Sequence, residues 1–380
     1  MNNATPTYPL LPFSQLVYHM SRWMPCVYRF HAKLIWHGHA ADTARVEQAL
    51  RTALSNHPVF SMRTNWCGKR YAAKLTNILH GKHHHFDINV QDNDLHIDLS
   101  LNRILGDGRS IEILIDDFLK ALRGEPLEKD DYWGYVDEYE RLKQEPHYLT
   151  SQEWLKREFA DESIPVRPTT DCRWLSTLLP PKPGCHKADY SDLHAKIQSI
   201  TSSHYLNADG FFSLCTALAI AEYCGTEEAA LTWAYEGRET AGEQRIFGSL
   251  HRDIPFRIRK TDITNPLTAI NQARNQIRSG IAHSNYPYTL TEPYDKRWNY
   301  AVNVLRVPDE EYVQSLLTEQ MELHIRPQKY AYALLDVEIH EHPNKLELWF
   351  NYSATHYQAE SIQRFAAIVR KYAEWITDID

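Results

Sequence analysis

The segment NRILGDG, residues 102–108, carries the side chains whose types and spacing suggest chemistry. Asn102 and Arg103 follow an alternating polar and apolar run, and Asp107 stands before a glycine. A carboxylate can accept a proton or fix an arginine, whereas a guanidinium stays protonated at neutral pH and binds anions. The segment therefore predicts a site that binds or orients a charged group, and it contains no imidazole.

The elements on either side predict how this segment is held. In DLHIDLSL, residues 94–101, alternate side chains point to opposite faces, as in a half-buried strand. A helix is expected next, because Ser110 can cap its start and Gly124 can end it. The sequence thus predicts a strand, a loop and a helix, with the polar groups of residues 102–108 in the loop.

Two other groups of polar residues invite a catalytic interpretation. His96, Asp98 and Ser100 have the types of a nucleophilic triad, but strand residues two apart lie ~6.6 Å from each other with parallel side chains. A nucleophile and its base need hydrogen-bond reach, about 3 Å, so no triad is predicted. The segment HGKHHHFD, residues 80–87, is expected to be a solvated loop or strand edge and not a metal site, because adjacent histidines rarely converge on one ion.

Bulk properties set the class of protein. The 380 residues are 43% hydrophobic, enough for a packed core, and the net charge of −8 excludes a nucleic-acid footprint over the whole chain. No apolar run reaches about 18 residues and no signal peptide is visible, so a soluble, cytoplasmic protein without a membrane span is expected, as a monomer. Reduced thiols are expected for the six cysteines, at positions 26, 67, 172, 185, 215 and 224, which show no CxxC pairing.

A proline-rich stretch, residues 163–190, predicts the boundary between two domains. We expect an N-terminal lobe at 1–164, which carries the 102–108 loop, and a C-terminal lobe at 165–380. Each lobe is predicted to mix a sheet with helices. The expected helices of the second lobe lie at about 191–203, 208–224 and 265–281, with a last amphipathic helix beyond them.

The order of these segments resembles a condensation domain of nonribosomal peptide synthetases, in the chloramphenicol acetyltransferase superfamily. NRILGDG stands where that family has HHxxxDG, EGRETAGEQRIFGSLHRDIPFR is similar to its GR and GxFxNTLPLR segments, and HSNYPY resembles its HQDxPFE. The resemblance implies an α/β (α+β) fold of two chloramphenicol acetyltransferase-like lobes with a V-shaped cleft and a central tunnel. It also implies latch and floor segments that cross from the C-terminal lobe.

The resemblance also assigns expected roles to single residues. Asn102 and Arg103 take the places of the two motif histidines, and Asp107 is expected to form a structural pair with an arginine of the other lobe, here Arg238. Two interpretations of Arg103 stay open, a substrate ligand and a residue salt-bridged at the loop. The hypothesised substrate-binding residues are Ser100, Ser110 and Asn303, and the two further imidazoles that the family's crossing segments bring toward the tunnel are His251 and His283.

The function implied is that of a stand-alone acyltransferase without the usual catalytic histidine. It would move an acyl group from acyl-CoA or a phosphopantetheinyl carrier-protein thioester to an amine or hydroxyl, with no bound cofactor. Arg103 would hold the oxyanion or an acceptor carboxylate. The alternative is a non-catalytic module that binds a carrier protein or recruits a tailoring enzyme. The cyclisation motif DxxxxDxxS is matched only in part, by Asn102, Asp107 and Ser110, because an amide cannot replace a carboxylate base.

Overall fold

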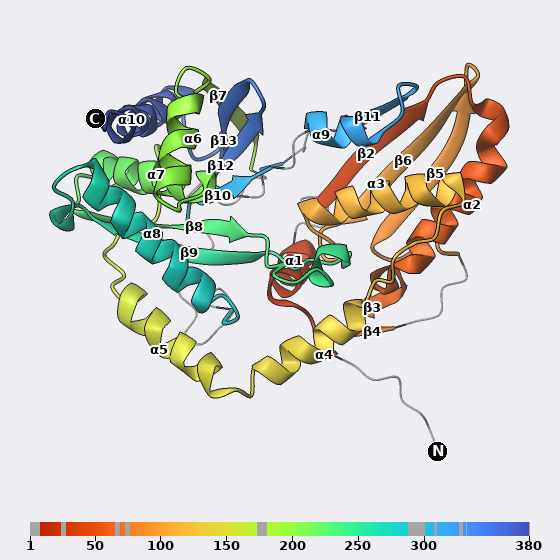
Figure 1. Cartoon of the computed structure of the whole chain (residues 1–380), viewed down its shortest axis with the longest axis horizontal. Coiled ribbons are helices and arrows are strands. Elements are labelled where there is room, and N and C mark those ends of the chain that lie inside the picture. Colours follow the sequence, from red (N-terminus) through yellow and green to blue (C-terminus); the bar gives the residue numbers. More distant parts are fainter. Residues whose placement is uncertain are drawn as a thin grey trace. The chain divides into compact units, whose positions relative to one another are not determined.

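The computed structural model describes residues 8–23, 28–64, 69–72, 77–172, 181–287, 301–307, 310–326, 330–331 and 333–379 (Figure 1). The chain forms two compact units, each with its own sheet and helices, so the predicted mixed α and β fold is present. The first unit consists of Met1–Leu142, Glu236–His251 and Glu310–Gln328, and the second of Lys143–Tyr235, Arg252–Asp309 and Lys329–Asp380.

The two compact units are discontinuous in the sequence, whereas the predicted lobes, 1–164 and 165–380, are contiguous. Residues 143–164 pack with the second unit, and the segments Glu236–His251 and Glu310–Gln328 return to the first. The proline-rich stretch indicates a crossing, but local composition does not record on which unit a later segment packs. The predicted boundary of the lobes stays a prediction.

The sheet of the first unit has four antiparallel strands in the order β11-β2-β6-β5. Strand β6 (Asp94–Asn102) is central and lies between β2 (Arg29–Trp36) and β5 (His84–Gln91), with β11 (Met321–Ile325) at the other edge. Leu95, Ile97 and Leu101 of β6 are buried, and the alternate residues form the polar face of the sheet. The strand predicted at 94–101 is thus confirmed.

Two amphipathic helices accompany this sheet. Helix α2 (Thr43–Asn56) packs against α3 (Gly108–Arg123), whose buried side chains include Leu114 and Phe118. Helix α3 ends at Gly124, which adopts φ +73, a left-handed conformation that glycine tolerates without strain.

The remaining elements of the first unit surround these. They are β1 (Tyr8–Pro9), α1 (Pro12–Trp23), η1 (Ala40–Asp42), η2 (Pro58–Ser61), β3 (Met62–Thr64), β4 (Lys69–Ala72), α4 (Tyr132–Leu142), η4 (Glu243–Arg245) and α9 (Glu310–Leu316). Strands β1, β4 and β3 form a separate small antiparallel sheet.

The second unit is built on a six-stranded mixed sheet, in which β10 runs parallel to both of its neighbours. In sheet order the strands are β7 (Pro183–Asp189), β13 (Lys345–Ser353), β12 (Leu335–His342), β10 (Asn303–Arg306), β8 (Glu228–Tyr235) and β9 (Arg252–Arg259). The other elements are α5 (Pro146–Phe159), α6 (His194–Ser203), α7 (Ala208–Cys224), η5 (Lys260–Asp262), α8 (Pro266–Ala282) and α10 (Ala359–Thr377). The four helices predicted after the boundary are therefore confirmed.

Helix α7 forms the centre of this unit. Its side chains from Gly210 to Ala221 are all buried, and it packs against α8 and α10 (Figure 1). Among the described residues, no helix is both long and apolar enough to cross a membrane. Cys172, Cys185, Cys215 and Cys224 are free thiols. Cys26, Cys67 and Tyr288, the last residue of HSNYPY, lie outside the described residues.

Candidate functional site

Strand β6 ends at Asn102, whose side chain shapes the loop that follows. Asn102 is 8% exposed, and its Oδ1 accepts a hydrogen bond from the backbone N–H of Ile104 at 2.9 Å. The backbone N–H of Asn102 donates to the carbonyl of His83 at 2.8 Å. The side-chain amide of Asn102 therefore holds the turn, which fits a role in positioning the loop.

Arg103 is the next residue of the turn and is half-buried. Its backbone N–H donates to the carbonyl of Tyr28, just before β2, at 2.9 Å. The turn is thus anchored on both sides, to β5 through Asn102 and to β2 through Arg103. An amide and a guanidinium at these two positions cannot take a proton from an acceptor at neutral pH.

Asp107 and Arg238 form the buried ion pair that the resemblance implied. Two parallel hydrogen bonds join them, from Nη1 to Oδ2 at 2.9 Å and from Nη2 to Oδ1 at 3.0 Å. The Arg238 side chain is fully buried and also donates to the carbonyls of Ile246 and Gly248. The resemblance places this arginine in the other lobe, but Arg238 lies in the first compact unit together with Asp107.

The Asp107 carboxylate accepts several further hydrogen bonds. It receives the backbone N–H and hydroxyl of Ser110 at 3.1 and 2.8 Å, and the backbone N–H groups of Leu250 and His251 at 2.9 and 3.2 Å. Burial alone would raise the pKa of Asp107, but the charge and hydrogen bonds of Arg238 outweigh it and lower that pKa. Asp107 is therefore a structural anion and not a general base.

Asp107 is also the N-cap of α3, a role that the sequence assigned to Ser110. Ser110 is instead the third residue of the helix and forms a capping box with Asp107, in which each side chain binds the backbone N–H of the other residue. Its hydroxyl, which is fully buried, also lies 3.0 Å from the carbonyl of Gly248. These contacts fit a structural role for Ser110. A substrate that bound to the Ser110 hydroxyl, as hypothesised, would have to compete with Asp107 and the Gly248 carbonyl for it.

Close packing explains the glycine before Asp107. A Cβ at Gly106 would lie 2.8 Å from the Cβ of Ser110 and 2.9 Å from Cε1 of Phe247. Real Cβ atoms do not approach other atoms so closely, so a side chain at Gly106 would displace the α3 cap.

His251 is the sequence candidate that the structure brings to the Asp107 loop. Its backbone N–H donates to the carboxylate, and its ring lies against Phe13 of α1, with ring centroids 3.9 Å apart. A substitution of the His251 side chain therefore leaves the backbone contact with Asp107 available.

The stripe His96, Asp98 and Ser100 lies on the polar face of β6 and forms no triad. Asp98 is paired with Arg326, and Ser100 accepts a hydrogen bond from Nη1 of Arg29 at 2.7 Å. Ser100 thus lies two residues before Asn102 on the same strand, with Arg29 beside it.

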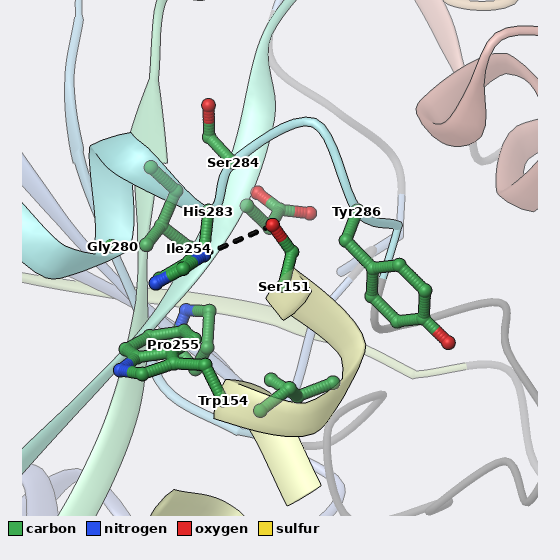
Figure 2. A pocket seen from close by; sticks show the side chains of 10 residues that line it. Ser151, Trp154, Ile254, Pro255, Gly280, His283, Ser284 and Tyr286 are labelled. Carbon is green, nitrogen blue, oxygen red and sulfur yellow. Dashed lines mark hydrogen bonds between the residues drawn. The ribbon is translucent and has the colours of Figure 1, made fainter. Parts of the chain in front are cut away.

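His283 and Asn303 belong to the second compact unit and not to the Asp107 loop. Figure 2 shows His283 in a small pocket with Ser151 and Trp154: Nδ1 lies 2.9 Å from Oγ of Ser151, and the Trp154 ring stacks on the imidazole at 4.7 Å. Burial lowers the pKa of His283. Oδ1 of Asn303 accepts a hydrogen bond from the Thr232 hydroxyl at 3.1 Å, between adjacent strands.

A buried network centred on His57 was not anticipated from the sequence. His57 follows α2, and its Nδ1 lies 2.8 Å from Asp130 and its Nε2 3.3 Å from Asp117, with all three side chains fully buried. Burial alone would lower the pKa of His57, but its close contacts with the two carboxylates raise it. A histidine before a proline is visible in the sequence, whereas its partners are 60 and more positions away.

We expect the stability contributed by His57 to depend on pH. Because its pKa in the folded state is raised above 6.5, the contribution is complete below about pH 6.5 and is lost as pH rises through the folded pKa. The free energy of unfolding of wild type minus that of His57→Gln, measured in urea, should therefore shrink between pH 6 and pH 9. A difference that stays constant over this range would show that the imidazole is neutral.

The family model for the condensation domain matches residues 83–378, most of the chain, and the protein therefore belongs to the condensation domain family. One curated relative is tyrocidine synthase 3 of Brevibacillus parabrevis, 23% identical over an alignment of 292 residues, with 70% of this chain covered. The chain spans only 4% of that relative's length.

Solved structures support the fold at low identity. The X-domain from teicoplanin biosynthesis matches with a TM-score of 0.78 and 13% identity, covering 100% of this chain and 99% of that one. The epimerization domain from the third module of tyrocidine synthetase B matches with a TM-score of 0.77 and 14% identity. This match covers 99% of this chain and 98% of that one. A variant of the starter condensation domain of rhizomide synthetase, in complex with C8-CoA, matches with a TM-score of 0.74 and 14% identity. This match covers 98% of this chain and 97% of that one.

Proposed function

We propose that the protein transfers an acyl group from a thioester to an amine or hydroxyl acceptor, without an imidazole at the position of the family's second motif histidine. The observation that carries the proposal is the state of the 102–108 loop. Asp107 and Arg238 hold the loop through a buried, bidentate pair. The resemblance assigns Asn102 and Arg103 to the positions of the two motif histidines.

The transfer step needs little help from a base when the acceptor is a neutral amine. Its nitrogen attacks the thioester carbonyl carbon, the C–S bond breaks, and the amine's excess proton leaves to the departing thiolate or to water. Holding the two reactants together is worth several kcal/mol, about 7–11 in well-oriented cases. Arg103 would stabilise the oxyanion of the tetrahedral intermediate or orient an acceptor carboxylate.

The donor is proposed to be acyl-CoA or a phosphopantetheinyl thioester on a carrier protein. Membership of the condensation domain family supports both, and the starter condensation domain of similar fold is in complex with C8-CoA. A carrier protein is then the expected partner, and the thioester is a substrate and not a bound cofactor.

The alternative is a module that binds a carrier protein or recruits a tailoring enzyme without catalysis. The observation that favours it is the engagement of the polar loop residues: the Asn102 amide holds the turn, and Asp107 is committed to Arg238 and Ser110. A loop of this kind can keep its shape for binding alone.

An assay with acyl-CoA and acyl-carrier thioesters against amines and alcohols separates the two. We expect product with an amine above the uncatalysed rate, and little with an alcohol. His251→Asn, which keeps the backbone bond to Asp107, and His283→Asn, the matched imidazole of the second unit, should both retain that rate. Loss of the rate in a folded His251→Asn variant would assign the base to His251. If no thioester yields product while a carrier protein binds, the chain is the non-catalytic module.

A further inference from the structure

The histidine-rich segment 80–87 separates into two faces in the structure. His83 and His84 are buried, at 9% and 2% exposure, which corrects the expectation that the whole segment is solvated. The alternation of β5 turns His84 toward Phe60, with ring centroids 4.9 Å apart, and turns His85 to the opposite, exposed face. The predicted strand edge is correct, because β5 is the edge strand of its sheet.

Backbone pairing brings a second exposed histidine beside His85. His80 and His85 face each other in an isolated antiparallel bridge, flanked by hydrogen bonds from Gly81 N–H to the His84 carbonyl and from Phe86 N–H to the Leu79 carbonyl, both 3.0 Å. Directly opposed residues project their side chains to the same face of a sheet. The arrangement is thus fixed by the backbone and does not depend on side-chain packing.

Asp87 completes the group, because it lies two residues after His85 on the same strand face. Nδ1 of His80 lies 2.6 Å from Nδ1 of His85, and Nε2 of His85 lies 2.7 Å from Oδ2 of Asp87. One ligand atom from each residue falls within 4.8 Å of the others. The His85 and Asp87 side chains are 50% and 48% exposed, so an ion can reach them from solvent.

We propose that His80, His85 and Asp87 form a surface site for a divalent transition-metal ion of the zinc type, made of residues outside the 102–108 loop. Two imidazoles and one carboxylate suit Zn²⁺, whereas Mg²⁺ and Ca²⁺ prefer oxygen ligands. With Zn–N and Zn–O distances of about 2.0–2.2 Å, tetrahedral ligand atoms lie roughly 3.3 Å apart. Only one nitrogen of His85 can bind the ion, so the set of one ligand atom from each residue, which spans up to 4.8 Å, must close toward this separation. Exposed side chains can do so by rotating, and water would fill the fourth position.

The neighbouring carboxylate does not belong to this set. Asp98 lies opposite Asp87 on β6, but it is paired with Arg326. The proposed site therefore offers one carboxylate and two imidazoles, which suits a single divalent ion. The bound ion would join the 77–81 turn to β5, the edge strand.

Calorimetric titration of untagged, chelator-washed protein with ZnCl₂ tests the proposal. We expect one saturable Zn²⁺ per chain, no such site with MgCl₂, and binding at least tenfold weaker in His85→Asn and in Asp87→Asn. The matched control is His37→Asn. His37 is 44% exposed and also paired with an aspartate, Asp94, at 2.8 Å, and its removal should leave the affinity unchanged.

Three results would overturn the site. They are a wild-type titration without a saturable Zn²⁺ site, an unchanged affinity in His85→Asn, and an equal loss of affinity in His37→Asn. The last would mean that Zn²⁺ binds to exposed histidines in general. None of these results bears on acyl transfer, because the variants leave the 102–108 loop intact.

Discussion

Replacing Asp107 by alanine will lower the free energy of unfolding by about 3–5 kcal/mol, the usual cost of removing one partner from a buried ion pair. The substitution leaves the fully buried guanidinium of Arg238 without its bidentate carboxylate. It also removes the cap of α3 and the acceptor for the N–H groups of Leu250 and His251. Urea denaturation followed by circular dichroism measures the effect.

Two further variants make this measurement specific. Asp137 is an exposed aspartate on α4, and Asp137→Ala should change stability by no more than about 0.5 kcal/mol. Arg238→Met combined with Asp107→Ala should cost less than the sum of the single changes, because no charge is then left buried alone. An unfolding curve of Asp107→Ala that overlays the wild type would contradict the pair and the placement of the loop.

Replacing Arg103 by alanine will lower kcat/KM for acyl transfer by about 2–4 kcal/mol, roughly 30- to 1,000-fold, if its guanidinium meets the developing oxyanion. Arg103→Lys should keep part of the rate, because the charge remains while the planar fork is lost. Circular dichroism should verify that each variant is folded before the rates are compared.

The matched control is Arg123→Ala at the end of α3, where Arg123 pairs with Glu125 at the surface. It should leave kcat/KM unchanged. Equal activity in wild type and Arg103→Ala would remove Arg103 from the mechanism and favour the interpretation of Arg103 as a residue salt-bridged at the loop.

Local patterns predicted the elements that carry the loop, and the resemblance predicted the contact between distant segments. Period-two alternation gave β6, and the apolar face of the following segment gave α3. The pair of Asp107 with Arg238 joins residues 131 positions apart, which only the family motifs placed together. The cap was assigned to Ser110 because serine is a common N-cap, but Asp107 competes for that role three residues earlier.

Other features depend on tertiary contacts that no local pattern records. The pKa of His57 is raised because two aspartates from later segments enclose it. His80 lies beside His85 because backbone hydrogen bonds close the turn between them. The sequence shows how many histidines the segment has, but not which of them face solvent and which face the core. The return of Glu236–His251 to the first unit likewise follows from packing and not from composition.

The pH dependence of acyl transfer to an amine tests most directly whether the protein works without an imidazole in the 102–108 loop. The side-chain amide of Asn102 cannot act as a base, and Arg238 holds Asp107 ionised, since it lowers the pKa of that carboxyl. We predict that kcat/KM rises steadily with pH toward the pKa of the amine and shows no earlier inflection. A bell-shaped profile, or a plateau with an inflection at about pH 6.5, would mean that an imidazole acts as the base and would contradict the account.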